Sequence, residues 1–351
     1  MDKKLEISLC MINRNDSKNL DYLLDRVKDL FEEIIIVDTG STDDSVSVAR
    51  KYTDKVYEAG NKYLNEDGML LSFSDPRNES FSYATQPWIM WLDTDDDIDD
   101  FSLFRKDFEE LKLSGEKSVL RMDYLYSWNE DHTVCCQVGN RERIVKNNMG
   151  WKWETPVHEY LEHKDYDDFK EIFGKSKVIH RSVGARNAND RNFFILRNWF
   201  KQETDPKLID RIKYYIADEM LHSEPGKYNF REYLDIFKQL AMSSKYKNEA
   251  AFNACAVLYN ERLGHELISF LENFLENNKD LDCSQYREFL AVVYFYQNND
   301  IKSSIENIML SMTLPLHKTF KFSLFQNSSD KENWIKEIKG MKNETKNKKT
   351  S

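Results

Sequence analysis

Short, strongly apolar runs that end in polar or acidic residues dominate the first hundred positions of the chain. The expected strands are residues 7–12, 33–38, 55–59 and 88–93. Runs this apolar are typical of strands that are covered on both faces of a sheet. Amphipathic stretches at residues 17–31, 45–52 and 75–85 lie between them and predict helices. Crossovers of this length join parallel neighbours, so the pattern predicts a mainly parallel α/β sheet.

The pattern changes after residue 97, where longer strands of antiparallel type follow. We expect them at residues 118–128 and 134–146, with a shorter one near residues 177–181. The predicted fold class is therefore α/β with a mixed, mainly parallel sheet.

Strand signals vanish after about residue 187, and helix-length segments follow to the tail. These segments lie near residues 190–203, 206–223, 228–243, 247–262, 264–277, 284–298 and 300–313. Ala217, Ala254 and Ala291 recur in them at a spacing of 37 residues. This resembles degenerate tetratricopeptide repeats, although small residues recur in any packed helical bundle. We expect an α/β domain at 1–186, a helical domain at 187–320, and a C-terminal helix with a disordered Lys-rich tail at 321–351.

Composition narrows the functional classes. The chain has 351 residues, with 61 acidic and 50 basic side chains and a net charge of −11. A general affinity for nucleic acid or anionic membrane is therefore not expected. Five cysteines without a C-x-x-C pair predict a reducing compartment. No apolar segment reaches the roughly 18 residues that span a bilayer, and no secretory signal is evident, so we expect a cytoplasmic protein.

Acidic residues at strand ends are the strongest chemical signal. Asp93, Thr94 and Asp95 follow the apolar run at 88–92, and Asp38 ends an earlier strand. Carboxylates held together repel one another unless a cation such as Mg²⁺ or Mn²⁺ lies between them. Both loops should open on one edge of the sheet, where such folds bind ligands. The alternative is an ordinary acidic turn or helix start.

Glycine-rich phosphate loops are absent, since the chain contains neither G-x-G-x-x-G nor G-x-x-x-x-G-K-[ST]. A Rossmann dinucleotide site or a P-loop is therefore not expected. Arg77 is suited either to phosphate or to a salt bridge with the acidic cluster. Asn78 is expected to cap a helix.

Five sequence blocks together resemble glycosyltransferase family 2. The blocks are Asn13-Arg14-Asn15-Asp16, Val37-Asp38-Thr39-Gly40-Ser41-Thr42-Asp43, Pro76-Arg77-Asn78, Trp91-Leu92-Asp93-Thr94-Asp95 and Trp153-Glu154-Thr155-Pro156-Val157-His158-Glu159. Their order and spacing over residues 5–185 are more specific than any single block. The chain is most similar to bacterial members with a C-terminal helical-repeat region, which include protein and peptide glycosyltransferases of the bacteriocin type.

The resemblance implies a GT-A fold, a nucleoside-diphosphate-sugar donor such as a UDP-sugar, a divalent cation (Mn²⁺ or Mg²⁺) and inversion at the anomeric carbon. The residues carried over to the donor are Asn13, Asp38, Arg77, Asp93 and Thr94. Those carried over to the metal are Asp95 and His180, although a lone histidine near a strand end is more often structural.

An inverting transfer needs a base that takes the acceptor's proton. The block around Trp153 supplies three candidates, and we rank Glu159 before His158 and Glu154. Trp151 and Trp153 either present flat faces to sugar rings or pack in the core. This block departs from many relatives, which carry Gly near Thr155.

The predicted function is transfer of a hexose or N-acetylhexosamine to an acceptor, which could be a polypeptide or a saccharide. The helical domain would recognise that acceptor or form a homodimer. Two other classes stay open: a nucleotidyltransferase with a related fold, and a non-catalytic helical-repeat scaffold, for which the acids at the strand ends would be expected to be lost.

Overall fold

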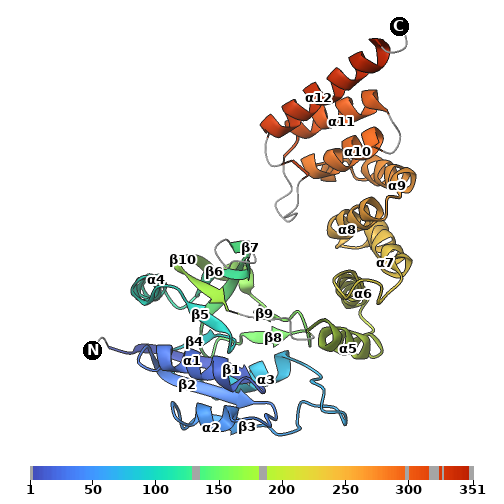
Figure 1. Cartoon of the computed structure of the whole chain (residues 1–351). Helices are drawn as coiled ribbons and strands as arrows, with labels where there is room; N and C mark the ends of the chain where they lie inside the picture. The colour runs from blue at the N-terminus through green and yellow to red at the C-terminus, as the bar shows by residue number, and fades with distance from the viewer. Residues whose placement is uncertain are drawn as a thin grey trace. The chain divides into compact units, whose positions relative to one another are not determined.

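The computed structural model describes residues 3–128, 135–181, 188–296, 300–315, 324–325 and 328–347 (Figure 1). The chain divides into two compact units, residues 1–198 and residues 199–351. Each unit has its own hydrophobic core.

The N-terminal unit is built on an eight-stranded sheet with the order β3-β2-β1-β4-β7-β6-β10-β5. The strands are β1 (Leu5–Asn13), β2 (Phe31–Asp38), β3 (Val56–Glu58), β4 (Trp88–Trp91), β5 (Asp96–Ile98), β6 (Ser118–Trp128), β7 (Cys135–Lys146) and β10 (Lys170–His180). The first four are parallel to one another, whereas β7 is antiparallel to β4 and to β6. The predicted mixed, mainly parallel sheet is confirmed.

Helices cover the sheet because its strands are apolar on both faces. They are α1 (Ser17–Val27), α2 (Ser45–Ala49), α3 (Ser74–Ser82) and α4 (Phe101–Leu113). In β1, Leu9 and Met11 belong to the core that includes α1 and α4, whereas Cys10 lies in a second core with α3. A small hairpin, β8 (Lys152–Glu154) and β9 (Tyr160–Glu162), completes that second core.

Three local expectations were wrong or incomplete. No helix was expected where α4 forms, and β10 begins at Lys170 rather than near residue 177. Asn78 does not cap a helix, because it lies inside α3. Its side chain instead exchanges two hydrogen bonds with the backbone of Trp153, at 2.8 and 2.9 Å. This pair fixes the β8–β9 hairpin on α3.

The C-terminal unit is helical, as predicted. Its helices are α6 (Pro206–Leu221), α7 (Phe230–Ser243), α8 (Lys247–Asn260), α9 (Gly264–Asn277), α10 (Ser284–Tyr296), α11 (Ile301–Thr313) and α12 (Ser328–Asn347), while α5 (Ala188–Phe200) crosses the division between the units. Each helix from α6 to α12 packs on the next along the chain. A short 3₁₀ turn lies at Lys279–Leu281 in this unit, and another lies at Tyr166–Asp168 in the N-terminal unit.

The three evenly spaced alanines lie in alternate helices, α6, α8 and α10, and all are fully buried. Small buried residues allow close helix contacts in repeats and in ordinary bundles alike. The repeat interpretation therefore stays a prediction. Within the described residues, no helix is long and apolar enough to cross a membrane.

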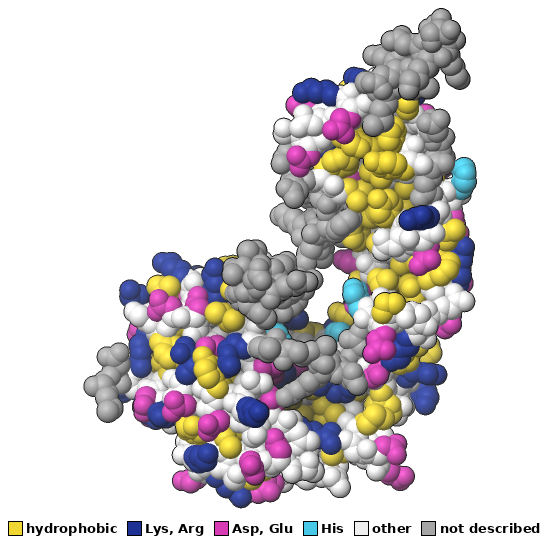
Figure 2. Space-filling view, viewed as in Figure 1, with side chains coloured by type: hydrophobic (Ala, Val, Ile, Leu, Met, Phe, Trp, Pro, Cys, Tyr) yellow, Lys and Arg dark blue, Asp and Glu magenta, His cyan; other side chains and the backbone are white. Residues whose placement is uncertain are grey.

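Side chains of both charges are spread over the visible surface of the N-terminal unit, whereas hydrophobic side chains gather on the visible face of the C-terminal unit (Figure 2). Large apolar side chains that are exposed in that unit include Met242, Tyr296, Met309 and Leu310. Single exposed apolar side chains are normal and occur on the N-terminal unit too, for example Leu113 and Phe173, whereas side chains gathered into one patch are typical of binding surfaces.

Candidate active site

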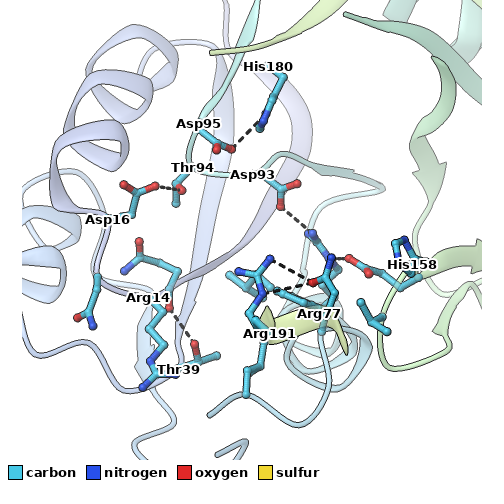
Figure 3. A pocket seen from close by; sticks show the side chains of 18 residues that line it. Arg14, Asp16, Thr39, Arg77, Asp93, Thr94, Asp95, His158, His180 and Arg191 are labelled. Atoms are coloured by element: carbon cyan, nitrogen blue, oxygen red, sulfur yellow. Dashed lines mark hydrogen bonds and ion pairs between the residues drawn. The ribbon is translucent and has the colours of Figure 1, made fainter. Parts of the chain in front are cut away.

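A cavity of about 600 Å³ lies at the edge of the sheet where β1 and β4 end. Side chains from both strand ends, from α3, from the β8–β9 turn and from α5 line it (Figure 3). The lining residues are Ile12, Asn13, Arg14, Asn15, Asp16, Thr39, Leu70, Phe73, Arg77, Asp93, Thr94, Asp95, Val157, His158, Glu159, His180, Arg191 and Asn192. The edge is the one that the sequence predicted for a ligand.

Asp95 and His180 lie side by side at this cavity (Figure 3). The pairing of β5 with β10 brings them together, because His180 is the register partner of Asp96. The His180 Nδ1 atom lies 3.5 Å from Asp95 Oδ1 and 3.7 Å from Asp96 Oδ1. One ligand atom from each of these three residues lies within 4.8 Å of the others.

Asp96 follows Asp95 in the acidic run, but the sequence assigned it no role of its own. It is fully buried, and its Oδ2 accepts hydrogen bonds from the Asp93 backbone N–H at 3.0 Å and from Arg143 at 3.1 Å. Its Oδ1 has no hydrogen-bond partner in the described part of the chain. A buried oxygen without a hydrogen bond destabilises the fold unless another group contacts it. The Asp96 Oδ1 is therefore a candidate ligand atom for a cation.

The electrostatics of this corner favour a cation. Burial raises the pKa of the Asp95 carboxyl to about 6; His180 opposes this shift, and Asp93 and Asp96 add to it. Burial lowers the pKa of His180, but the neighbouring carboxylates of Asp96 and Asp95 outweigh it and raise the pKa overall. Two carboxylates and an imidazole fit Mn²⁺, and Mg²⁺ prefers few carboxylates together with substrate phosphates.

Arg77 joins two of the predicted site residues. Its Nη2 donates to Asp93 Oδ1 at 2.7 Å, and its Nε donates to Glu159 Oε1 at 2.9 Å. The guanidinium is buried over the rings of Trp91 and Trp153, at 5.2 and 5.0 Å from their centroids. Burial alone would lower the pKa of Arg77, but the carboxylates of Asp93 and Glu159 outweigh this effect and raise the pKa overall. The side chain therefore stays charged. The ion-pair interpretation of Arg77 is the one observed, while its contact with a phosphate stays a prediction, although the side chain also lines the cavity.

Asp38 does not line the cavity, unlike the other residues assigned to the donor. Its Oδ1 accepts from the backbone N–H groups of Gly40 and Ser41, and its Oδ2 accepts from Asn13 at 3.0 Å and from the Ser41 hydroxyl. The turn needs glycine at position 40, where φ is +86° and a Cβ would lie 2.8 Å from the Gly60 carbonyl oxygen. Asp38 therefore shapes the loop, while Thr39 faces the cavity.

Asn13 and Thr94 both line the cavity. The Asn13 Oδ1 is buried without a partner among the described residues, so it is available to a ligand N–H or hydroxyl. The Thr94 hydroxyl donates to Asp16 Oδ2 at 2.5 Å. That bond ties the acidic turn to the end of β1.

The three candidate bases have different surroundings. Glu159 and His158 line the cavity, and both also line a smaller recess of about 140 Å³ behind Arg77. Glu154 lines neither and pairs with Lys152 at 3.0 Å. Positive φ angles at Thr155 (65°) and His158 (51°) bend the turn that carries Glu159. Strained backbone of this kind is often found at functional sites.

Trp151 and Trp153 pack in the core instead of offering open faces. They are 9% and 3% exposed and belong to the cluster that covers the α3 face of the sheet. Trp153 packs edge-on against Trp91, with centroids 4.9 Å apart. Of the two roles considered for this pair, core packing is the one observed.

Several lining residues had no role in the sequence analysis. Arg14 and Asp16 stood in a quoted block without an assignment, and Phe73 and Arg191 lie in segments without a motif. The Arg14 Nε is buried and lacks a hydrogen-bond partner within the described ranges. The Arg191 guanidinium lies 4.6 Å from the centroid of the Phe73 ring. Only the fold brings these residues to the acidic turn.

Residues 8–106 match the family model described as glycosyl transferase family 2. This range contains most of β1, the strands β2 to β5, the helices α1 to α3 and the acidic turn.

Among curated proteins, a TPR repeat-containing protein of Synechococcus elongatus is 39% identical over 160 residues, which cover 45% of this chain and 36% of that protein. The SPbeta prophage-derived glycosyltransferase SunS of Bacillus subtilis is 37% identical over 89 residues, covering 25% of this chain and 20% of SunS. The chain thus spans only about a third or less of the length of these relatives.

Among solved structures, TarS of S. aureus (residues 1–349, in complex with UDP-GlcNAc) is 13% identical, covers 86% of this chain and 89% of that chain, and has a TM-score of 0.40. Glucosyl-3-phosphoglycerate synthase of Mycobacterium tuberculosis, in complex with Mn²⁺, UDP and its glucosylated product, is 13% identical, covers 57% and 81%, and has a TM-score of 0.36. Both scores are too low to transfer a site.

Proposed function

Residues 8–106 of the chain form a glycosyl transferase family 2 domain, and from this premise we propose that the protein is a metal-dependent, inverting glycosyltransferase. It would move a hexose or N-acetylhexosamine from a nucleoside-diphosphate sugar, most simply a UDP-sugar, to an acceptor. The observation that carries the proposal is the cavity at the sheet edge, where Asp95 and His180 lie on one wall with the buried Asp96 directly behind them.

Asp95 and His180 would hold the divalent cation. When bound, the cation stabilises the negative charge that builds on the leaving diphosphate. The raised pKa of Asp95 supports this assignment, because a cation relieves the repulsion from Asp93 and Asp96 that contributes to the shift. The Asp96 Oδ1, which has no hydrogen-bond partner among the residues that the structure describes, supports it independently.

The donor's nucleoside would lie against Asn13 and Thr39, on the side of the cavity where β1 and β2 end. The Asn13 Oδ1 would accept from a base N–H or a ribose hydroxyl. Asp93 would face the ribose, and Arg77 would fix the orientation of Asp93. Asp38 would act through the loop and not by direct contact, because its oxygens are already engaged.

Glu159 would be the base that accepts the acceptor's proton. Its Oε1 is anchored by Arg77, while its Oε2 takes part in none of the hydrogen bonds of the described residues. The carboxylate borders both the large cavity and the smaller recess behind Arg77, so it lies between two spaces that could hold the two substrates. His158 is the second candidate because it borders the same spaces.

The helical unit would recognise a polypeptide acceptor. The apolar side chains exposed on it support this role, because such side chains favour protein contacts. A saccharide acceptor, a homodimer through this unit and a cytoplasmic location stay predictions.

The test is a transfer assay with a panel of UDP- and other nucleotide sugars, with and without Mn²⁺, read by release of nucleoside diphosphate and by the mass of candidate acceptors. Asp95→Ala should abolish metal-dependent turnover, and Glu159→Gln should reduce transfer about 10²–10⁴-fold while donor binding is retained. Glu154→Gln is the matched control and should stay near the wild-type rate.

Full activity of Asp95→Ala would remove its metal role. Unchanged transfer in Glu159→Gln would reassign the base to His158. Release of pyrophosphate from a nucleoside triphosphate would instead identify a nucleotidyltransferase.

A further inference from the structure

Arg143 is a fully buried cation directly behind the acidic turn. It lies on β7, and its guanidinium is stacked 3.8 Å from the centroid of the Trp91 indole and 4.5 Å from that of the Tyr124 ring. Its Nη1 donates to the Trp91 carbonyl oxygen at 3.3 Å and to Asp96 Oδ2 at 3.1 Å. The Nε and Nη2 atoms have no hydrogen-bond partner in the described ranges.

The partner carboxylate is held on one side only. Asp96 is as deeply buried as Arg143, and its Oδ2 is occupied by Arg143 and by the Asp93 backbone N–H. Among the described residues the Oδ1 makes no hydrogen bond, and it lies 3.7 Å from His180 Nδ1, on the side of Asp95. Arg143 and the turn thus orient this oxygen toward the same cluster that faces the cavity.

Burial of an ion pair of this kind adds little to the free energy of folding and can reduce it. Both charges lose their hydration, and the return is limited unless further hydrogen bonds satisfy the remaining atoms. In the part of the chain that the structure describes, two guanidinium nitrogens and one carboxylate oxygen of this pair lack such bonds. Apolar side chains of similar volume would stabilise the fold at least as well as this pair, so stability alone does not explain it.

We propose that Arg143 is a positioning residue of the cation site: by holding Asp96 Oδ2, it presents Asp96 Oδ1 as a third ligand beside Asp95 and His180. The inference rests on the proposed function only in that the site takes a divalent cation. It adds a ligand, and a side chain that orients the ligand, to the two metal residues that the sequence analysis selected.

The test measures binding of Mn²⁺ alone, by the loss of the free-ion electron paramagnetic resonance signal, to the full chain and its variants. Asp96→Asn keeps the shape of the side chain and should weaken Mn²⁺ binding at least about tenfold, as is common for groups around a metal. Arg143→Met should weaken it by a similar factor, and Arg143→Lys should recover part of the loss because it retains the charge.

Arg121→Met is the matched control. Arg121 lies on the neighbouring strand β6 and pairs with Glu142 and with Glu171, away from the acidic turn. Its loss weakens an ion-pair network of the same sheet and should leave Mn²⁺ affinity unchanged.

A double variant covers the case in which Arg143→Met fails to fold. Asp96→Asn with Arg143→Met removes both buried charges, so it should fold but bind Mn²⁺ as weakly as Asp96→Asn. Wild-type affinity in Asp96→Asn or in the double variant would overturn the inference and leave the proposed function standing. Absence of Mn²⁺ binding by the wild-type chain would instead remove the metal dependence on which both rest.

Discussion

At the scale of single residues, the site is shaped by like charges that the fold forces together. Asp93, Asp95 and Asp96 lie within one turn, and different partners moderate each of them. Arg77 pairs with Asp93, Arg143 pairs with Asp96, and Asp95 faces His180. Burial, with the neighbouring charges of Asp93 and Asp96, raises the pKa of the Asp95 carboxyl, and His180 only partly offsets this.

This arrangement predicts a pH dependence of stability. The pKa of Asp95 is about 6 in the folded chain and 3.8 for an ordinary Asp, so the folded state binds the proton more tightly. Its stabilising contribution is present below pH 3.8 and is lost as pH rises through about 6. The raised pKa of His180 acts in the same direction. Between pH 5 and 7.5, Asp95 alone should lower the unfolding free energy of the cation-free protein by about 1–1.5 kcal/mol.

Denaturant unfolding in EDTA measures this, with Asp95→Asn as the variant in which most of the decrease should disappear. Added Mn²⁺ should stabilise the wild type more at pH 7.5 than at pH 5, since ligation requires the deprotonated carboxylate. An equal pH dependence in wild type and Asp95→Asn would show that this acid is not perturbed.

At the scale of elements, the irregular strand β10 positions His180. Its pairing with β6 shifts register between Phe173 and Lys177, and Asp107 on α4 holds the irregular segment. Asp107 Oδ2 accepts from the backbone N–H groups of Lys175 (3.0 Å) and Ser176 (2.8 Å) and from the Ser176 hydroxyl (2.6 Å). One buried carboxylate therefore satisfies the donors that the shift leaves without strand partners.

Asp107→Ala should destabilise the protein by about 2–4 kcal/mol, because it leaves buried donors unsatisfied. Glu110→Ala, at an exposed position on the same helix, should change stability by less than about 0.5 kcal/mol. Urea unfolding of both variants checks this. Equal midpoints would mean that the segment does not depend on Asp107.

Much of the fold was predictable because its signals are local. Helices α6 to α11 lie within about two residues of their expected bounds, since each has its own apolar face. The first strands were predictable because β1 and β2 are buried on both faces. The role of Asp107 was not, because it is set by a contact with β10 some 70 residues later. Helix α4 itself carries local signals that were passed over, an Asp100 N-cap and the buried Phe104, Phe108 and Leu111 at helical spacing.

The site was predictable only in part, for similar reasons. The acids of the turn are visible as a cluster in the sequence, and they do meet His180. The role of Asp38 in shaping the loop could not be predicted, because it depends on the turn that glycine at position 40 permits. In that turn, backbone N–H groups donate to the Asp38 carboxylate. Arg143 carries no motif, and its contact with Asp96 depends on the antiparallel packing of β7 beside β4.

At the scale of the whole molecule, the cavity belongs to the N-terminal unit. Its lining residues all come from residues 12–192, and α5 contributes Arg191 and Asn192. The helical unit adds no residue to it. The proposed division of labour is therefore donor chemistry in the first unit and acceptor recognition in the second.

A chain shortened to residues 1–203, which retains all of α5, should bind UDP in the presence of Mn²⁺ within about threefold of the full chain and should lose transfer to a polypeptide acceptor. Calorimetry and mass spectrometry measure the two properties. Shortening to residues 1–187 removes α5 and should weaken UDP binding further. Retained polypeptide transfer by the 1–203 fragment would remove the acceptor role of the helical unit.

The most direct measurement is a crystal structure with UDP and Mn²⁺, with data collected at the manganese absorption edge. We expect one anomalous peak in the cavity, within coordination distance of Asp95, Asp96 and His180 and of the UDP diphosphate. UDP bound in the cavity with no anomalous peak beside those three side chains would contradict the central claim that the acids of this turn hold the cation.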